Sequence, residues 1–264
     1  MTGWSSLKSV IKKGLKARGV HVYRALPRGF ELAHDLRSAL PHQRFEIIFD
    51  VGANIGQSAA SFLDDFPAAR IWCFEPSATL HSKLARRFSD NSRVTCERFA
   101  LSSSQGEAYL KHSPNTSMFH LTSLCSDELP ANVTPGDGEI VVGKTLDRYC
   151  HDAGISHIDF LKVDTEGHDL EVLRGANSLL AAGTIACLQC ECSMSRDNVF
   201  HRSFEEIKFF VEPFGYRLFG IYEQVEDWIM DKPNLRRIDA AFVAPVVMWE
   251  NRISLRQTAG SLVS

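Results

Sequence analysis

The sequence predicts an α/β protein with a mostly parallel sheet that helices cover on both faces. From Phe45 onward, short apolar runs alternate with helical stretches, which is typical of parallel strands joined by crossover helices. A glycine turn follows the first apolar run and an acidic turn follows a later one, as expected for loops at the carboxyl ends of strands. With 264 residues, 44% of them hydrophobic, the chain can bury a full core.

Apolar runs bounded by turn residues indicate seven strands, and longer amphipathic stretches indicate the helices between them. The predicted strands are 46–51, 70–75, 93–99, 157–163, 184–191, 216–222 and 239–245. The predicted helices are 55–66, 77–88, 145–153, 169–182 and 203–212, the last beginning with a capping box of Ser203 and Glu206. Residues 112–138 are rich in Ser, Thr, Asn, Pro and Gly, so we expect an irregular lid or substrate-binding loop there. Residues 223–237 indicate a second variable loop.

The domain prediction is a basic helical extension at 1–44, a catalytic domain at 45–246 and a tail at 247–264. Residues 1–30 carry seven Lys and Arg before the first acid, Glu31, and their apolar residues recur at helical spacing. This helix is expected to pack on the domain or a partner subunit, or else to contact an anionic membrane surface. The sequence does not indicate an oligomeric state.

The composition of the chain argues against several classes of function. The net charge of −3 and the lack of a basic cluster with interleaved aromatics in the body of the chain argue against nucleic-acid binding. The sequence contains no run of about 18 apolar residues, so it predicts no membrane span. Seven cysteines, an odd number, favour reduced thiols and a cytoplasmic location over a disulfide framework. The Cys187–Cys190 spacing has no second ligand pair, so it does not favour zinc.

The first motif, Asp50-Val51-Gly52-Ala53-Asn54-Ile55-Gly56, has the pattern of a nucleoside-binding turn between a strand and a helix. Its glycines are spaced G-x-x-x-G, without the third glycine of a dinucleotide site, and Asp50 would repel a pyrophosphate. Glu75 lies 19 residues after Gly56, where a partner for ribose hydroxyls is expected. The motif therefore favours S-adenosylmethionine, which carries a sulfonium cation and no phosphate, over a nicotinamide cofactor.

The second motif follows the apolar strand that ends near Val163, and it delivers Asp164, Glu166, His168 and Asp169 into one turn. His168 is a candidate general base because the ordinary pKa of histidine lies near neutral pH. Asp164 is a candidate for orienting the substrate or accepting its proton. A divalent cation held by Asp164 and Glu191 is an alternative that the sequence does not favour. Capping of the following helix explains one of these acids and hardly all four polar side chains.

These two motifs together resemble those of the FkbM-type S-adenosylmethionine-dependent methyltransferases. The resemblance rests on residues 49–56 (FDVGANIG) and 161–176 (LKVDTEGHDLEVLRGA), with Glu75-Pro76, residues 99–102 and residues 145–147 in the order of that family. It implies a doubly wound, seven-stranded sheet of the class I, Rossmann-like type, with the last strand antiparallel. It also implies methyl transfer, usually to a hydroxyl oxygen of a sugar, glycan or polyketide-like natural product.

The resemblance further implies a set of site residues. Asp164, Glu166 and His168 would border the methyl-transfer site, although the position of His168 varies in such proteins. Cofactor contacts would come from Asp50, Gly52, Ala53, Asn54, Gly56, Glu75, Pro76, Ala100, Leu101 and Asp164. The acceptor is expected to be a small molecule, a glycan or a lipid-linked compound. The alternatives are a non-catalytic cofactor-binding or scaffold protein of the same fold and, less favoured, a nicotinamide-dependent oxidoreductase.

Overall fold

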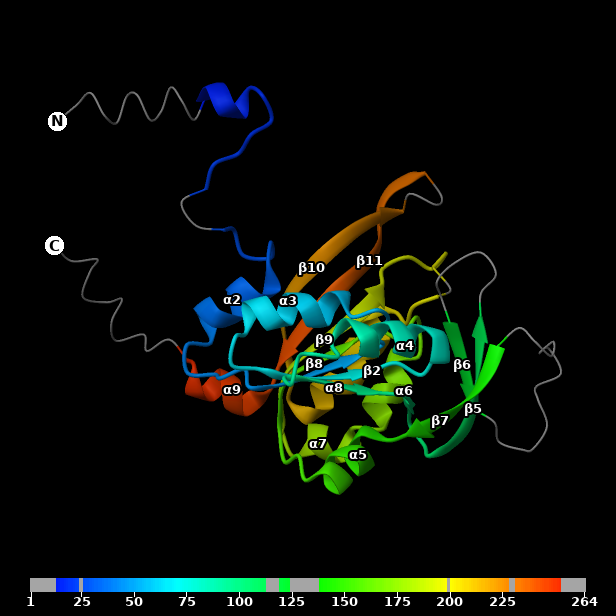
Figure 1. Cartoon of the computed structure of the whole chain (residues 1–264). Coiled ribbons are helices and arrows are strands. Elements are labelled where there is room, and N and C mark those ends of the chain that lie inside the picture. Colours follow the sequence, from blue (N-terminus) through cyan, green and yellow to red (C-terminus); the bar gives the residue numbers. More distant parts are fainter. Residues whose placement is uncertain are drawn as a thin grey trace.

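The computed structural model describes residues 13–23, 26–112, 119–123, 138–198, 200–227 and 231–252. Its centre is a seven-stranded sheet with the strand order β10-β11-β9-β8-β1-β2-β3 (Figure 1). The strands are β1 (Ile47–Val51), β2 (Arg70–Phe74), β3 (Val94–Glu97), β8 (Ile158–Val163), β9 (Ile185–Ser193), β10 (Arg217–Asp227) and β11 (Lys232–Val243). β11 runs antiparallel to its neighbours β10 and β9, and the other pairs are parallel. The predicted seven-stranded sheet with an antiparallel last strand is therefore confirmed.

Helices cover both faces of this sheet (Figure 1). On one face lie α2 (Leu32–Ala39), α3 (Gln57–Asp65) and α4 (Ala78–Arg87), and on the other lie α5 (Leu146–Ala153), α6 (Asp169–Arg174), α7 (Asn177–Ala181) and α8 (Phe204–Val211). The predicted helix at 169–182 is wrong in one respect, because it is divided into α6 and α7. The carboxylate of Asp147 accepts hydrogen bonds from Ser178 N (2.8 Å) and Leu179 N (3.1 Å), which gives α7 its own N-terminal cap. The capping box of Ser203 and Glu206 is confirmed at α8.

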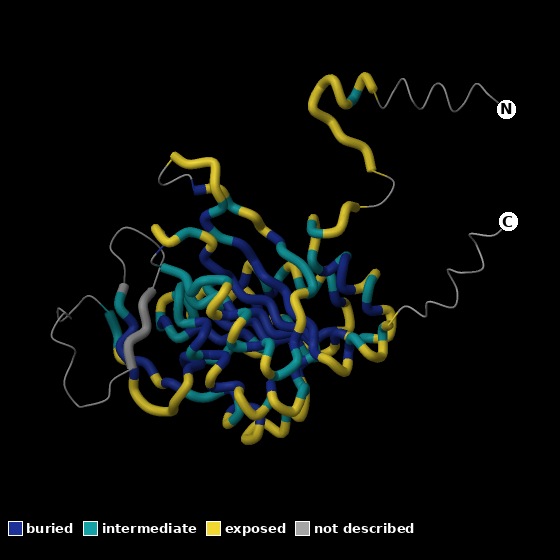
Figure 2. The backbone as a smooth tube through the Cα atoms, turned by 180° about the vertical axis from the view of Figure 1, so that it is seen from behind, coloured by how far each residue is buried: buried dark blue, intermediate teal, exposed yellow. Residues whose placement is uncertain are grey.

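The core lies along the central strands. Buried backbone fills the centre of the molecule (Figure 2). Every residue of β8 is buried, and in β1 only the first residue is partly exposed. Such burial on both faces explains why these strands are mostly apolar in sequence, apart from Asp50, Asp159 and Lys162. Phe49 on β1 contacts Trp72 and Phe74 of β2, with ring centroids 5.5 and 5.2 Å apart. Because the two central strands hold the core together, the turns that leave their carboxyl ends start from fixed positions.

A second, four-stranded sheet has the order β4-β7-β5-β6. Its strands are β4 (Ala100–Leu101), β5 (Gly106–His112), β6 (Phe119–Ser123) and β7 (Gly138–Lys144). The expectation of an irregular loop over 112–138 is wrong at 119–123, because β6 pairs with β5 in an antiparallel register from Ala108 and Ser123 to His112 and Phe119. Residues 113–118 and 124–137 lie outside the described residues.

The segment 223–237 is also more regular than the sequence indicates. Most of it belongs to β10 and β11, which pair well beyond the part of the sheet that they share with β9. Register shifts between Tyr222 and Asp227 allow this long pair to bend, as β-bulges do. The described residues therefore place a two-stranded arm, and no loop of variable structure, next to the carboxyl end of β9 (Figure 1). Residues 228–230 lie outside the described part.

The N-terminal segment differs from the predicted continuous helix. Residues 13–16 are helical, but residues 20–23 and 26–31 are not, because Gly19 adopts φ +76 and Pro27 and Gly29 (φ +89) interrupt the pattern. α2 then contributes Leu36 to the main core, and Leu40, directly after the helix, joins it. Residues 1–12 lie outside the described residues, and the domain division at residue 44 stays a prediction. Among the helices that the structure describes, none is long and apolar enough to cross a membrane.

Gly52 is the point at which the turn after β1 meets the end of β8. A Cβ atom on Gly52 would lie 1.9 Å from the backbone oxygen of Asp164, and the residue has φ +82. The backbone groups Gly52 N and Ala53 N both donate to Phe74 O, at 3.0 and 3.1 Å, which ties the same turn to β2. The turn has no freedom to move away from β8, so only glycine fits there.

We expect Gly52→Ala to destabilise the fold far more than Gly154→Ala, which is a matched control. Gly154 also has a positive φ (+67), but nothing lies within 4 Å of its Cβ position. Gly154→Ala should lower the free energy of unfolding by about 1 kcal/mol, from backbone strain alone. Gly52→Ala adds a backbone collision, so we expect a loss of about 3 kcal/mol or more. Urea denaturation of both variants measures this, and equal losses would contradict the packing argument.

Candidate active site

A cavity of about 280 Å³ opens at the carboxyl ends of β1, β2 and β8. Side chains and backbone from the glycine turn, from the second sheet and from the acidic turn after β8 all contribute to its wall. The predicted site residues in this wall are Gly52, Ala53, Asn54, Glu75, Pro76, Ala100, Leu101, Asp164, Glu166 and His168. Asp50 and Gly56 are the two predicted residues that are not in it. Residues from four distant parts of the sequence are thus brought to one place.

Gly56 and Asp50 both support the turn from behind. Gly56 (φ +82) is the N-cap of α3, and a Cβ there would lie 2.4 Å from the Phe88 ring and 2.8 Å from Leu84, so this glycine allows close packing of α3 on α4. Asp50 is fully buried on β1, opposite Lys162 of β8 in the sheet register. The structure therefore places both residues outside the cavity wall.

Glu75 follows β2 and closes over the glycine turn. Its Oε2 accepts a hydrogen bond from Asn54 N (3.0 Å), and its Oε1 accepts one from Ser77 N (2.9 Å). Asn54 holds a left-handed backbone (φ 51), which points its N–H at this carboxylate. Burial raises the pKa of Glu75 to about 7, although both backbone N–H groups oppose the rise. Each carboxylate oxygen keeps a second lone pair for a hydroxyl ligand.

Lys162 provides a buried positive charge between two acids. Its Nζ lies 2.8 Å from Asp164 Oδ2 and 3.8 Å from Asp50 Oδ1. Burial alone would lower the pKa of Lys162, but Asp164 and Asp50 hold it above its usual range, so the side chain stays charged. Burial raises the pKa of Asp50, an effect that Lys162 opposes. Lys162 is the only Lys or Arg among the described residues of the cavity wall, against the acids Glu75, Asp164 and Glu166.

The acidic turn after β8 is held in an uncommon backbone conformation. Glu166 adopts φ 53 although it has a side chain, and Gly167 follows with φ +96. Asp169 Oδ2 accepts hydrogen bonds from Thr165 Oγ1 (3.1 Å) and from Gly167 N (3.2 Å), which stabilises this shape. Burial raises the pKa of Asp169 to about 6. A non-glycine residue in this conformation costs free energy and persists only where the surrounding structure holds it in place. Such residues cluster at functional sites.

His168 occupies the N-cap position of α6 and lies in the cavity wall. Its Nε2 lies 3.0 Å from Ser102 Oγ. Burial lowers the pKa of His168 to about 4, so the imidazole is neutral at physiological pH and is a weak proton acceptor. The carboxylates of Asp164 and Glu166 line the same cavity and are the other candidates for that task. The apolar side of the cavity comes from Phe99, Ala100, Leu101 and Leu110.

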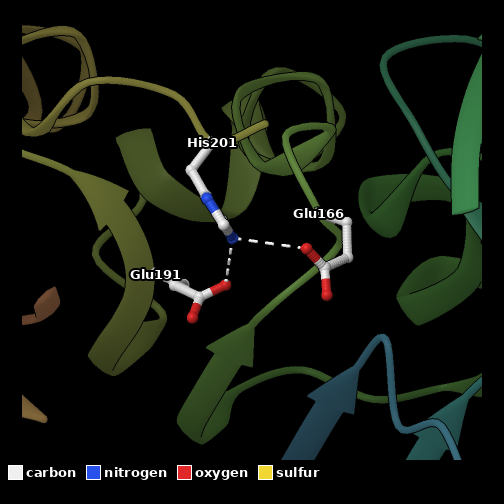
Figure 3. Close-up of side chains that lie close together, drawn as sticks. All are labelled: Glu166, Glu191 and His201. Atoms are coloured by element: carbon white, nitrogen blue, oxygen red, sulfur yellow. Dashed lines mark ion pairs between the residues drawn. The ribbon is translucent and has the colours of Figure 1, made fainter. Parts of the chain in front are cut away.

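His201 is a neighbour of the site that sequence reasoning missed. It lies in the loop between β9 and α8, and its Nε2 is 2.6 Å from Glu191 Oε2 and 3.3 Å from Glu166 Oε2 (Figure 3). From the sequence, Asp164 and Glu191 together are a possible cation site. In the structure Glu191 instead lies beside His201 and Glu166, whereas Asp164 forms its ion pair with Lys162. No short motif marks His201, because its place depends on how the loop folds back. Cys187, Cys190 and Cys192 are buried free thiols on β9.

Comparison with known proteins places this site in a family. Residues 50–218 match the family described as the methyltransferase FkbM domain, and this range includes both turns of the cavity. The chain is 31% identical over 163 residues to the methyltransferase sdnD of Sordaria araneosa, across 52% of this chain and 62% of that protein.

Two further relatives are similar over comparable lengths. The 2-O-methyltransferase NoeI of Sinorhizobium fredii is 28% identical over 142 residues, across 51% of this chain and 58% of the relative. The hexuronic acid methyltransferase AglP of Haloferax volcanii is 27% identical over 161 residues, across 58% of this chain and 59% of the relative. The chain thus spans less than two thirds of the length of each of these relatives. Because the family match covers more than half of the sequence, the chain belongs to the methyltransferase FkbM family.

Proposed function

We propose that this protein is an S-adenosylmethionine-dependent methyltransferase that methylates a hydroxyl oxygen of a sugar, a glycan or a polyketide-like natural product. One observation carries the proposal: Glu75, Asp164 and Glu166 face a cavity whose wall contains a single described Lys or Arg. A surplus of carboxylates suits a ligand with a sulfonium and an ammonium group. Family membership and the names of NoeI and AglP support the acceptor class.

The residues present fit this cofactor. The turn Gly52-Ala53-Asn54 offers a nearly bare backbone surface for the methionine portion, and Glu75 offers its lone pairs to the ribose hydroxyls. The apolar side at Ala100 and Leu101 suits the adenine ring. Asp50 would act indirectly, by holding Lys162 and the turn in place. A pyrophosphate would face the same carboxylates and be repelled, which disfavours a nicotinamide cofactor.

S-adenosylmethionine, when bound, supplies a methyl carbon on a positively charged sulfur that a hydroxyl oxygen can attack. The protein then has to position the acceptor oxygen and remove its proton. The Asp164 carboxylate is our first candidate for the proton acceptor, because it is about one-third exposed and Lys162 fixes one of its oxygens. Glu166 and His168 would border the acceptor. Positioning of the two reactants is a large part of the expected acceleration, on the order of 7–11 kcal/mol in well-oriented reactions.

Cofactor affinity should rise with pH. Glu75 has a pKa of about 7 in the free protein, so it is mostly protonated at pH 6 and mostly ionised at pH 8. Ribose hydroxyls donate to the ionised form, so binding requires loss of that proton below pH 7. We expect about a tenfold tighter Kd for S-adenosylmethionine at pH 8 than at pH 6. Calorimetry across this range checks it, and a slope that persists in Glu75→Gln would reject the assignment.

One variant should weaken the binding of S-adenosylmethionine, and another should slow the reaction without much change in that binding. Glu75→Ala removes the ribose partner, so we expect the Kd for S-adenosylmethionine to weaken by about tenfold to a hundredfold. Asp164→Asn keeps the shape of the turn but removes the proton acceptor, so kcat should fall by about 10²-fold or more with Kd within about threefold. Asp152→Asn, in an exposed pair with Arg148, is the control. Equal kcat in Asp164→Asn and the wild type would contradict this role.

Methyl transfer itself is tested with labelled S-adenosylmethionine. The protein is incubated with fractions of small molecules, glycans and lipids from its source, and the fraction that acquires the methyl group is identified. We expect label on a hydroxyl oxygen of a glycan or natural product. S-adenosylmethionine binding without S-adenosylhomocysteine formation in any fraction would favour the non-catalytic scaffold, and binding of nicotinamide dinucleotide instead would favour the oxidoreductase.

A further inference from the structure

Three side chains with metal-binding groups converge beside the cavity. Glu166 comes from the turn after β8, Glu191 from the end of β9, and His201 from the loop that leads to α8 (Figure 3). One ligand atom from each residue lies within 4.8 Å of the other two. This cluster is separate from the pair of Asp164 and Lys162. Glu166 belongs to both the cluster and the cavity wall, so the cluster adjoins the cavity.

The arrangement of side chains in the cluster favours a positive charge between them. Two carboxylate oxygens face one imidazole nitrogen, His201 Nε2, at 2.6 and 3.3 Å. Glu166 Oε2 is shielded from solvent and accepts no hydrogen bond from the described residues. Asn198 Oδ1 accepts a hydrogen bond from Phe200 N (3.1 Å), and both amide atoms of Asn198 lie near His201 Nδ1, with Oδ1 at 3.2 Å and Nδ2 at 3.0 Å. When Nδ1–H donates to this oxygen, the lone pair of Nε2 faces the carboxylates, and a cation can occupy the space between them.

The surroundings hold the three side chains in place. Arg237 pairs with Glu191 Oε1, which leaves Oε2 directed at the cluster. Gly167 and Phe200 pack backbone against backbone, since a Cβ on Gly167 would lie 2.2 Å from Phe200 O. Arg202 Nε also donates to Gly167 O (3.2 Å). The loop with His201 is thereby clamped to the turn with Glu166. Hydrogen-bonded partners of this kind orient the ligands of metal sites.

We propose that Glu166, Glu191 and His201 bind one divalent transition-metal ion, whose remaining coordination positions face the cavity that Glu166 lines. Metal–ligand distances of about 2.0–2.2 Å require separations of about 3 Å or more between ligand atoms. The pair of Glu166 and His201, at 3.3 Å, meets this, and the pair of Glu191 and His201 has to open by less than about 1 Å. One imidazole with two carboxylates suits Mn²⁺, Fe²⁺ or Zn²⁺ better than Mg²⁺ or Ca²⁺.

The ion's role in the reaction rests on the proposed methyl transfer, whereas its binding does not. An acceptor hydroxyl that coordinates the ion loses its proton more readily, as metal-bound water does. The proton would pass to Asp164 and then to solvent. The acceptor oxygen would form its bond to the methyl carbon while the carbon–sulfur bond breaks and its electron pair stays on sulfur. The ion would therefore raise kcat while leaving the affinity for S-adenosylmethionine nearly unchanged.

The test is titration of the full-length, metal-stripped protein with Mn²⁺, followed by calorimetry and electron paramagnetic resonance. Mn²⁺ is the better probe because the chain contains free cysteines, which attract Zn²⁺. We expect one Mn²⁺ per chain, with tighter binding than Mg²⁺. His201→Ala and Glu191→Gln should each weaken Mn²⁺ binding at least tenfold. Glu166→Gln is the third variant, since its partly exposed side chain makes misfolding less of a concern.

His151→Ala is the matched control, because His151 also lies beside a carboxylate, that of Asp152, but on the exposed surface of α5. It should bind Mn²⁺ as the wild type does. The proposal is overturned if the wild type binds no stoichiometric Mn²⁺, or if folded His201→Ala and Glu166→Gln both bind it equally well. The proposed catalytic role of the ion is overturned if kcat is the same with and without Mn²⁺. Calorimetry with S-adenosylmethionine on the same samples shows separately whether the proposed function fails.

Discussion

The contact between Gly52 and the backbone oxygen of Asp164 is the constraint on which the site depends. β1 and β8 are neighbours in the sheet, so the turns that leave their carboxyl ends compete for the same space. The absence of a side chain at Gly52 lets the two turns touch, and this contact sets the distance between the glycine turn and the acidic turn. The wall of the cavity is then continuous from Asn54 to Glu166. A bulkier residue would separate the two halves of the site.

Charge is the second feature that organises this region. Asp50, Lys162, Glu75 and Asp169 are all buried, and burial of such groups is costly unless they are paired. Lys162 compensates for Asp50 and Asp164, and backbone N–H groups compensate for Glu75 and Asp169. The compensation is incomplete, since the pKa values of Glu75 and Asp169 are raised. The described cavity wall holds Glu75, Asp164 and Glu166 against the one positive charge of Lys162, so a cationic ligand that binds there would also stabilise the folded state.

The main sheet was predictable because its central strands are buried on both faces and its turns carry strong glycine and acidic signals. The second sheet was not, because β6 is short and lies inside a segment rich in Ser, Thr, Asn, Pro and Gly that reads as a loop. Ten of the predicted site residues line one cavity, whereas Asp50 and Gly56 lie outside its wall, a distinction that depends on which way a side chain leaves the backbone. His201 could not be found from a motif. Its position follows from the packing of Phe200 on Gly167, and no local pattern encodes that contact.

The strand order also has a consequence for the way in which the protein acquires its site. β1 pairs with β8, from Ile48 opposite Phe160 to Val51 opposite Val163, so the central pair joins segments more than 100 residues apart in the chain. Pairings of such high contact order form slowly, because the entropy of closing a long loop is lost before the contact is made. During synthesis the glycine turn therefore emerges long before its partner. The cavity can assemble only after β8 has paired with β1, and a cofactor can assist folding only after that step.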